Sequence, residues 1–137
     1  MKFCKTSEYA IRVLVFLAVH DDRRYSVREL HEELSIPYKY LSRLMHQLTQ
    51  AGFVDVARGK VGGYLIAGPK ENIFLYQIVD TVEGLKNYDR CILGFKECSD
   101  ENPCSMHQYW VEERERIKNI LYSLSLADLA KNPNIRY

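Results

Sequence analysis

The sequence predicts a mainly α-helical fold with one small β-hairpin and a long helix near the end of the chain. Apolar residues recur at spacings of three and four through much of residues 7–50 and again over 105–124, the period of a helix with one buried face. Between these stretches, residues 53–66 change to β-favouring side chains on both sides of a glycine-rich turn. A polar loop with three of the four cysteines precedes the last long helix.

The first three helices are predicted over residues 7–20, 26–34 and 37–50. Ser26 has a glutamate three residues later, which is the spacing of a capping box at a helix start. Gly52 follows the third helix and suits a left-handed cap at its end. The apolar side chains that we expect this third helix to bury are Leu41, Leu44, Met45 and Leu48.

The rest of the chain is predicted from the same kinds of pattern. Two short strands, 53–56 and 64–66, form the hairpin. A helix over 69–84 follows, and a second capping-box spacing predicts that the long helix begins at Ser105. A short final helix is expected over 125–130.

Composition indicates a globular protein with an uneven charge. At 137 residues the chain fits one domain, and its 47% apolar and 27% charged residues are ordinary values. Residues 1–70 hold 11 Lys and Arg against 7 Asp and Glu, a net charge of +4, whereas residues 71–137 hold 8 against 11, a net charge of −3. A basic front half predicts an anionic partner for that half alone.

Localisation follows from what the sequence does not contain. The longest apolar run, Val13–Val19, is too short to cross a bilayer, and Arg12 interrupts any signal-peptide pattern. We therefore expect a cytoplasmic protein without a membrane partner. In a reducing compartment, clustered cysteines indicate metal binding or redox chemistry rather than structural disulfides.

The order helix, helix, turn, helix and hairpin is that of a winged helix-turn-helix, which places its second turn helix in the major groove of DNA. This predicts a DNA-binding domain over residues 1–84, a cysteine loop over 85–104 and a dimerisation segment over 105–137. Because the basic excess is modest, we expect a homodimer on a palindromic operator in double-stranded DNA. The candidate DNA contacts are Ser26, Tyr38, Lys39, Tyr40, Ser42, Arg43, Arg58 and Lys60.

These candidates have distinct expected roles. Arg43 suits guanine edges, and Lys39 and Ser42 suit bases or phosphates. Ser26 at a helix start suits a phosphate, and the cationic hairpin tip suits the minor groove or the backbone. Taken singly, the polar helix face and the basic hairpin each also fit an ordinary solvated surface. The prediction of DNA binding therefore depends on the occurrence of both elements in this order.

The cysteine loop has the pattern Cys91-x6-Cys98-x5-Cys104-x2-His107 and lacks the CxxC pairs of zinc ribbons. Wide spacing suits an iron–sulfur cluster, for which three thiolates need a fourth ligand. His107 is one candidate and Glu8 of a partner subunit is another; we favour a 2Fe–2S over a 4Fe–4S cluster. The alternatives are an exposed His107, and an ion pair of Glu8 with Arg12 on one helix face.

The long helix carries an apolar stripe that suits packing against a partner helix. Its members, proposed as the dimer interface, are Met106, Trp110, Ile117, Leu121 and Leu124. Packing of this stripe against the chain's own domain is the alternative.

The chain resembles the IscR/NsrR family of bacterial winged-helix transcription factors along nearly its whole length. The resemblance is carried by the segments SEYAIRVLVFLA, SVRELHEELSIPYKYLSRLMHQLTQAGFV, RGKVGGY, IVDTVEG and LADLAKN, and by the three cysteines. It implies a homodimer bridged by the long helix. It also implies a cluster held by Cys91, Cys98 and Cys104 with His107 or Glu8. Some members of the family lack a cluster, and the Cys91–Cys98 gap is one residue longer than in its best-known members.

The resulting hypothesis is a transcriptional regulator, of the repressor type, whose cluster senses redox state, nitric oxide or iron–sulfur status. One alternative keeps the DNA function and replaces the cluster with thiol oxidation or zinc. Another is a cluster carrier without DNA binding. An enzyme with Cys104 as nucleophile and His107 as base lacks an orienting third group. We therefore predict no enzyme activity and no small-molecule substrate.

Overall fold

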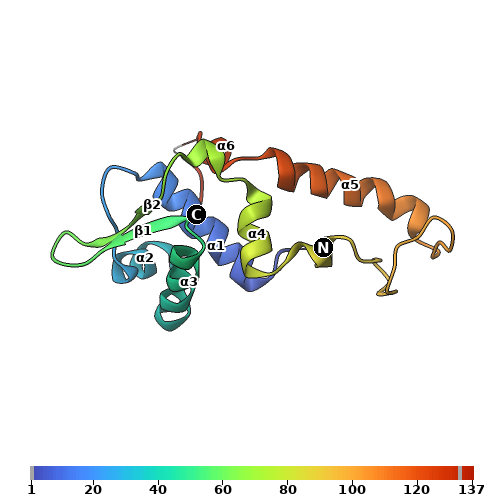
Figure 1. Cartoon of the computed structure of the whole chain (residues 1–137), viewed down its shortest axis with the longest axis horizontal. Helices are drawn as coiled ribbons and strands as arrows, with labels where there is room; N and C mark the ends of the chain where they lie inside the picture. Colours follow the sequence, from blue (N-terminus) through green and yellow to red (C-terminus); the bar gives the residue numbers. More distant parts are fainter. Residues whose placement is uncertain (1, 133) are drawn as a thin grey trace.

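The structure is a computed structural model that describes residues 2–132 and 134–137. As predicted, the fold is mainly helical with one antiparallel hairpin, and Figure 1 shows the hairpin at one end of an elongated molecule and the cysteine loop at the other. The elements are α1 Lys5–Val19, α2 Val27–Leu34, α3 Tyr38–Gln50, β1 Val54–Ala57, β2 Gly63–Ile66, η1 Lys70–Asn72, α4 Leu75–Val82, η2 Leu85–Tyr88, α5 His107–Ser123 and α6 Leu126–Leu129.

The main hydrophobic core joins α1 to the helix pair α2 and α3. Apolar side chains on most sides of α1 are buried, because α2, α3 and α6 all pack around it. The predicted capping box opens α2, with the Ser26 hydroxyl accepting from the Glu29 backbone and the Glu29 carboxylate accepting from Ser26. Gly52 has the left-handed conformation predicted for it, with φ of 82°. The four apolar residues expected on the inner face of α3 are all buried.

The hairpin is tied back onto the helical core. β1 and β2 pair antiparallel with Val54 opposite Ile66, and both strands lie within one residue of their predicted bounds. Tyr25, just before α2, forms a two-way backbone bridge to Tyr64, with N···O distances of 3.1 and 2.8 Å. The base of the hairpin is therefore held against the start of α2 rather than projecting alone.

The helix predicted over residues 69–84 is wrong in its first part. Residues 70–72 form a 3₁₀ turn, and α4 begins only at Leu75. The intervening residues bond to another part of the chain: the Ile73 carbonyl accepts from the Leu126 N–H at 2.6 Å, and the Leu75 N–H donates to the Leu124 carbonyl at 2.9 Å. Backbone groups used across this bridge are not free to continue a helix through residue 73.

The predicted helix start at Ser105 is also wrong. α5 begins at His107, after an N-cap Met106 whose side chain makes no capping hydrogen bond. A tight turn, in which the His107 N–H donates to the Cys104 carbonyl at 3.0 Å, takes the place of the capping box. The last cysteine of the loop is therefore joined to the first turn of α5.

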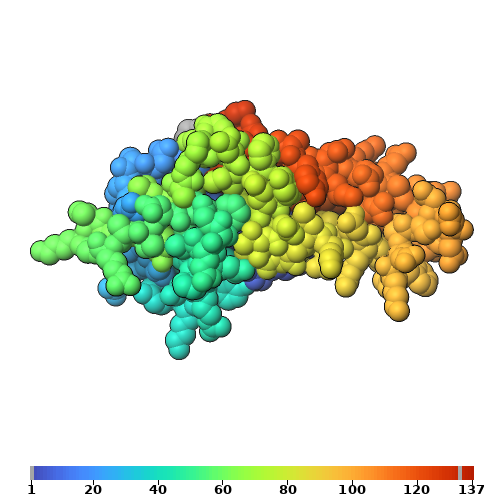
Figure 2. All heavy atoms as spheres, viewed as in Figure 1, coloured from blue at the N-terminus to red at the C-terminus, as the bar shows by residue number. Residues whose placement is uncertain are grey.

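A second, smaller core fastens α5 to the domain. Leu121 packs with Leu75, Val79 and Tyr88 of α4 and η2. Beyond this contact α5 extends with the cysteine loop alongside it, and Figure 2 shows the two together as one end of an elongated body. None of the helices in the described residues has the length and apolar character needed to cross a membrane.

Candidate nucleic-acid interface and metal centre

The outer face of α3 is polar and exposed, as expected of a helix that reads DNA. Leu41, Leu44, Met45 and Leu48 are buried in the core, and the exposed positions lie on the opposite face of the helix. Four predicted contacts lie exposed there, namely Tyr38, Lys39, Ser42 and Arg43. Tyr38 is exposed despite its large ring, which leaves it free to contact a base or sugar.

Tyr40, predicted as a DNA contact, is directed toward α1 instead. Its hydroxyl forms a short hydrogen bond with the hydroxyl of Thr6, and its ring packs edge-on against Tyr9 with centroids 5.2 Å apart. Ser26 likewise has a local role, because its hydroxyl accepts the Glu29 N–H at 3.1 Å as the cap of α2. Within the chain, Tyr40 and Ser26 therefore hold α3 and α2 in place, and their contact with DNA stays a prediction.

The hairpin presents a cationic tip on a braced base. Arg58 and Lys60 are both exposed, and they flank Gly59 at the turn, where φ is 105°. At the base, the Arg24 guanidinium donates to the carbonyls of Asp55 and Gly63 at 3.0 and 3.2 Å. In Figure 1 the hairpin lies at the same end of the molecule as α2 and α3, so the tip and α3 are available to one duplex.

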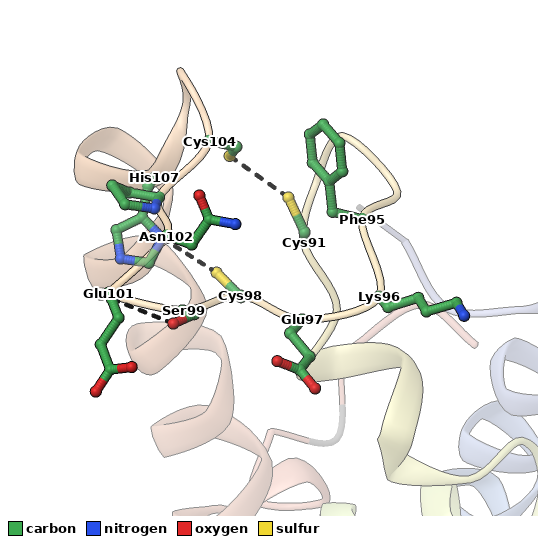
Figure 3. A pocket seen from close by; sticks show the side chains of 11 residues that line it. Cys91, Phe95, Lys96, Glu97, Cys98, Ser99, Glu101, Asn102, Cys104 and His107 are labelled. Atoms are coloured by element: carbon green, nitrogen blue, oxygen red, sulfur yellow. Dashed lines mark hydrogen bonds between the residues drawn. The ribbon is translucent and has the colours of Figure 1, made fainter.

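The three loop cysteines and His107 line one hollow of about 610 Å³. The Cys91 thiol lies 3.4 Å from the Cys104 sulfur, and the Cys98 sulfur lies 3.4 Å from Nδ1 of His107. Figure 3 shows the two contacts side by side, with Cys104 and His107 on one side, Cys91 and Cys98 on the other, and Phe95 at the edge. All four predicted donors are therefore brought together, from a loop and from the first turn of α5.

The His107 ring is held by a second contact. Its Nε2 lies 2.6 Å from a carboxylate oxygen of Asp100, which can accept the Nε2 N–H. Nδ1 is then the nitrogen that faces Cys98. A carboxylate behind a histidine is the common arrangement for orienting an imidazole toward a metal. Asp100 was not identified from the sequence, although its position two residues after Cys98 offered a signal.

The electrostatics of the hollow favour a thiolate. The backbone N–H of Leu93 is the largest influence and lowers the pKa of Cys91; burial opposes it, and hydrogen bonding with Cys104 adds to the lowering. Thiolates are the form in which cysteines bind soft metals.

The donor chemistry of the hollow fits an iron–sulfur cluster, for which cysteine thiolates and histidine are the usual ligands. Among the described residues, no three Cys, His, Asp or Glu side chains converge on one point. The donors form two pairs across a hollow instead. A preformed tetrahedral zinc site needs four donors around a single centre, so this arrangement fits a larger object better than one zinc ion.

Glu8 lies outside this hollow in the single chain. It forms an ion pair with Lys5 at 3.1 Å, and the expected pair with Arg12 is not among those of the described residues. Arg12 donates instead to the Leu34 carbonyl at 2.6 Å, which draws its guanidinium away from Glu8. Cys4 is also outside the hollow, at the N-cap of α1.

The apolar face of α5 differs from the predicted stripe. Leu121 is 1% exposed against its own chain, and Trp110 and Ile117 are half-buried. Two residues absent from the prediction, Tyr109 and Ile120, are 65% and 51% exposed. They lie about three helical turns apart, on the same face as Met106. The sequence stripe therefore divides into an inner part that holds α5 to the domain and an outer part that is uncovered.

Comparison with known proteins identifies the family and the fold. The sequence model of the Rrf2 family, described as iron-dependent transcriptional regulator, matches residues 3–132. The chain is 29% identical over 136 residues to the HTH-type transcriptional regulator IscR of Xenorhabdus nematophila, covering 98% of this chain and 82% of that one. The structure of CymR, the global cysteine regulator of Bacillus subtilis, is 26% identical with a TM-score of 0.77, covering 96% and 97% of the two chains. The oxidised form of Staphylococcus aureus CymR is also 26% identical, with a TM-score of 0.74 over 96% and 98%.

Proposed function

Because this chain belongs to the Rrf2 family of transcriptional regulators, and so is a DNA-binding regulator rather than an enzyme, we propose that an iron–sulfur cluster controls its affinity for DNA. The observation that carries the proposal is the hollow in which three thiols and the His107 imidazole face one another. A bound cluster would supply a centre that responds to oxidants, nitric oxide or the supply of iron and sulfide.

The chain's own residues divide the task of holding that centre. Cys91, Cys98 and Cys104 provide three thiolates, and His107 is the fourth ligand that the single chain offers, with Asp100 orienting its ring. Glu8 of a partner subunit is the alternative fourth ligand, because Glu8 lies exposed enough at the start of α1 to be reached by another chain. We favour a 2Fe–2S cluster over a 4Fe–4S cluster.

The DNA-binding unit that we propose is a homodimer on a palindromic operator. Each subunit offers one α3 and one cationic hairpin tip, which supply few phosphate contacts. Two subunits joined through the uncovered face of α5 would double those contacts and set the spacing of the two reading helices. That face includes Met106, Tyr109 and Ile120, and Ile117 and Leu124 flank it.

Control by the cluster follows from the position of the loop. The cysteine loop connects η2 to α5. A change in the order of the loop would therefore alter how α5 is placed relative to the DNA-binding domain. A change in the relative position of two α3 helices changes their fit to two half-sites, and hence the affinity. Such gating requires that the two states of the loop differ in free energy of DNA binding.

A second candidate is a cluster-free regulator that responds through thiol oxidation. The 3.4 Å separation of the Cys91 and Cys104 sulfurs and the lowered pKa of Cys91 favour this reading. The similarity to CymR proteins, one of them described in an oxidised form, supports it as well. A zinc-dependent regulator is the remaining form of this alternative.

Anaerobic reconstitution with iron and sulfide distinguishes these candidates. We expect wild-type and Cys4→Ala proteins to retain equal iron and acid-labile sulfide with visible charge-transfer absorbance, and Cys98→Ala to lose most of both. Operator affinity is then measured by fluorescence anisotropy with and without the cluster. Colourless wild-type protein without acid-labile sulfide would overturn cluster binding. Equal DNA affinity of the two forms would overturn gating.

A further inference from the structure

The segment IVDTVEG contains a carboxylate, that of Glu83, which the DNA interface and the cysteine hollow do not use. Glu83 is the C-cap of α4 and is half-buried. One of its oxygens accepts a hydrogen bond from the Tyr88 hydroxyl at 3.1 Å. The other accepts from the Cys4 backbone N–H at 3.1 Å and, at short range, from the Ser7 hydroxyl. A single carboxylate thus joins three donors from two separate parts of the chain.

On one side Glu83 is connected to the cysteine loop. Tyr88 is 4% exposed and ends η2, three residues before Cys91. The next residue, Asp89, pairs with Lys118 of α5 at 2.8 Å, so the entry to the loop is anchored to both α4 and α5. A displacement of the loop at Cys91 therefore acts on the Tyr88 hydroxyl and on the carboxylate that holds it.

On the other side Glu83 is connected to the helix that reads DNA. Ser7 is fully buried in the first turn of α1, and its neighbour Thr6 bonds to the Tyr40 hydroxyl on α3. A second contact runs in parallel, because the Gln47 amide of α3 donates to the Thr81 carbonyl at 3.1 Å, two residues before Glu83. The first turn of α1 therefore lies between the carboxylate and α3.

We propose that Glu83 is a positioning residue through which the state of the cysteine loop sets the orientation of α3. Its carboxylate holds the loop side through Tyr88 and the DNA side through Ser7, Thr6 and Tyr40. Ser7 and Tyr88 are buried, so either hydroxyl would lose its hydrogen bond to this carboxylate without gaining one to water. The inference rests on the proposed function only in taking the cysteine hollow as the sensing site.

The test is a double-mutant cycle on DNA affinity in the full-length chain. The first variant, Glu83→Gln, keeps the shape of the side chain but removes the charge and one acceptor. The second, Tyr40→Phe, removes only the hydroxyl. The third variant combines both substitutions. Glu71→Gln is the matched control, because Glu71 is exposed in η1 and its substitution changes the net charge equally. The probe is a labelled duplex enriched by the wild-type protein from a random library.

Loss of a negative charge by itself favours binding to DNA. We nevertheless expect Glu83→Gln to weaken binding by roughly 2- to 30-fold, the range of long-range coupling energies, while Glu71→Gln leaves it unchanged or slightly tighter. We expect the double variant to depart from the product of the two single effects by at least about 3-fold. Independent, multiplying effects, or equal effects of the two glutamine variants, would overturn the proposal.

Two further measurements distinguish a failure of this proposal from a failure of cluster gating. Tyr88→Phe removes only the hydroxyl that faces Glu83. In the Glu83→Gln background it should cause no further change in DNA affinity. It also replaces Glu83→Gln in the cycle if that variant fails to fold. Removing the cluster should change wild-type affinity more than it changes Glu83→Gln affinity. If the DNA affinity of the wild-type protein is the same with and without the cluster, the gating proposal fails. The double-mutant cycle between Glu83 and Tyr40 still decides whether the carboxylate positions α3.

Discussion

Gly63 at the start of β2 lies directly against the backbone of Tyr25, at the bridge that ties the hairpin to α2. A Cβ atom placed on Gly63 would come within 2.6 Å of both the carbonyl carbon and the carbonyl oxygen of Tyr25. Gly63 also has a φ of 122°, a conformation that side-chain-bearing residues rarely adopt. The attachment of the hairpin to the core therefore requires glycine for two separate reasons.

We expect Gly63→Ala to lower the free energy of unfolding by about 2–4 kcal/mol, because strain and the contact with Tyr25 add together. Gly68→Ala is the matched control: Gly68 has a φ of 74°, but a Cβ there would meet nothing within 4 Å. Its cost should be near 1 kcal/mol, from backbone strain alone. Urea unfolding measures both. Equal losses of unfolding free energy in the two variants would show that the backbone near Tyr25 moves away from the added Cβ at little cost.

Arg58→Gln should weaken DNA binding and also make it less sensitive to salt. Each phosphate contact that is removed lowers the slope of log affinity against log salt by about 1, so the slope reports contact with the backbone. Lys86→Gln, an exposed lysine in η2, is the charge-matched control. Anisotropy titrations at several salt concentrations measure the slope. An unchanged slope for Arg58→Gln would mean that the hairpin tip does not reach a phosphate.

The two faces of α5 should respond differently to substitution. Ile120→Glu places a charge on the uncovered face and should shift the protein from dimer toward monomer in sedimentation experiments. Asn119→Glu, an adjacent exposed position with the same added charge, should leave self-association unchanged. A dimer that tolerates Ile120→Glu would require another interface.

Leu121→Ala tests the inner face of α5. Because Leu121 is buried against Leu75 and Val79, its truncation should cost about 2–5 kcal/mol of unfolding free energy. Urea unfolding at matched protein concentration measures this loss. A change below about 1 kcal/mol would mean that α5 is not held to the domain by this contact.

The contribution of Glu83 to stability should depend on pH. Burial by itself raises the pKa of Glu83, but hydrogen bonds from Ser7, Cys4 and Tyr88 outweigh it and bring the pKa below its ordinary value. Because the pKa is lower in the folded state, the ionised carboxylate stabilises the fold. This contribution is fully present above about pH 4.5 and is lost as the pH falls through the pKa of the folded state. We expect Glu83→Gln to cost about 2 kcal/mol at pH 7 and clearly less near pH 3. A difference from wild type that stays constant over this range would contradict the ionised role of the carboxylate.

Asp100→Asn should weaken the hold of the cysteine hollow on its metal centre. The variant keeps the shape of the side chain but loses the charge that orients His107, and such changes typically cost 10- to 100-fold in metal affinity. Glu97→Gln is the control for charge, because Glu97 lines the hollow but is not the carboxylate that bonds to His107. Iron remaining after timed exposure to a chelator measures the effect. Equal retention in the two variants would argue against His107 as the fourth ligand and direct attention to Glu8.

Sequence patterns were enough to predict the order of helices and hairpin, the exposed face of α3 and the group of donors in the cysteine loop. These follow from local causes: side-chain periodicity within one or two turns, capping at Ser26, and cysteines close enough in sequence to meet in any compact loop.

The folded chain was needed to see where Tyr40 and Glu83 point, why the helix expected over residues 69–84 breaks at Ile73, and which face of α5 the domain covers. These features depend on partners far away in the sequence, as Thr6 is from Tyr40 and Leu75 is from Leu121. A periodic apolar stripe shows that a helix face can be buried, but the free energy of packing between distant segments selects which part of that face is buried within the chain.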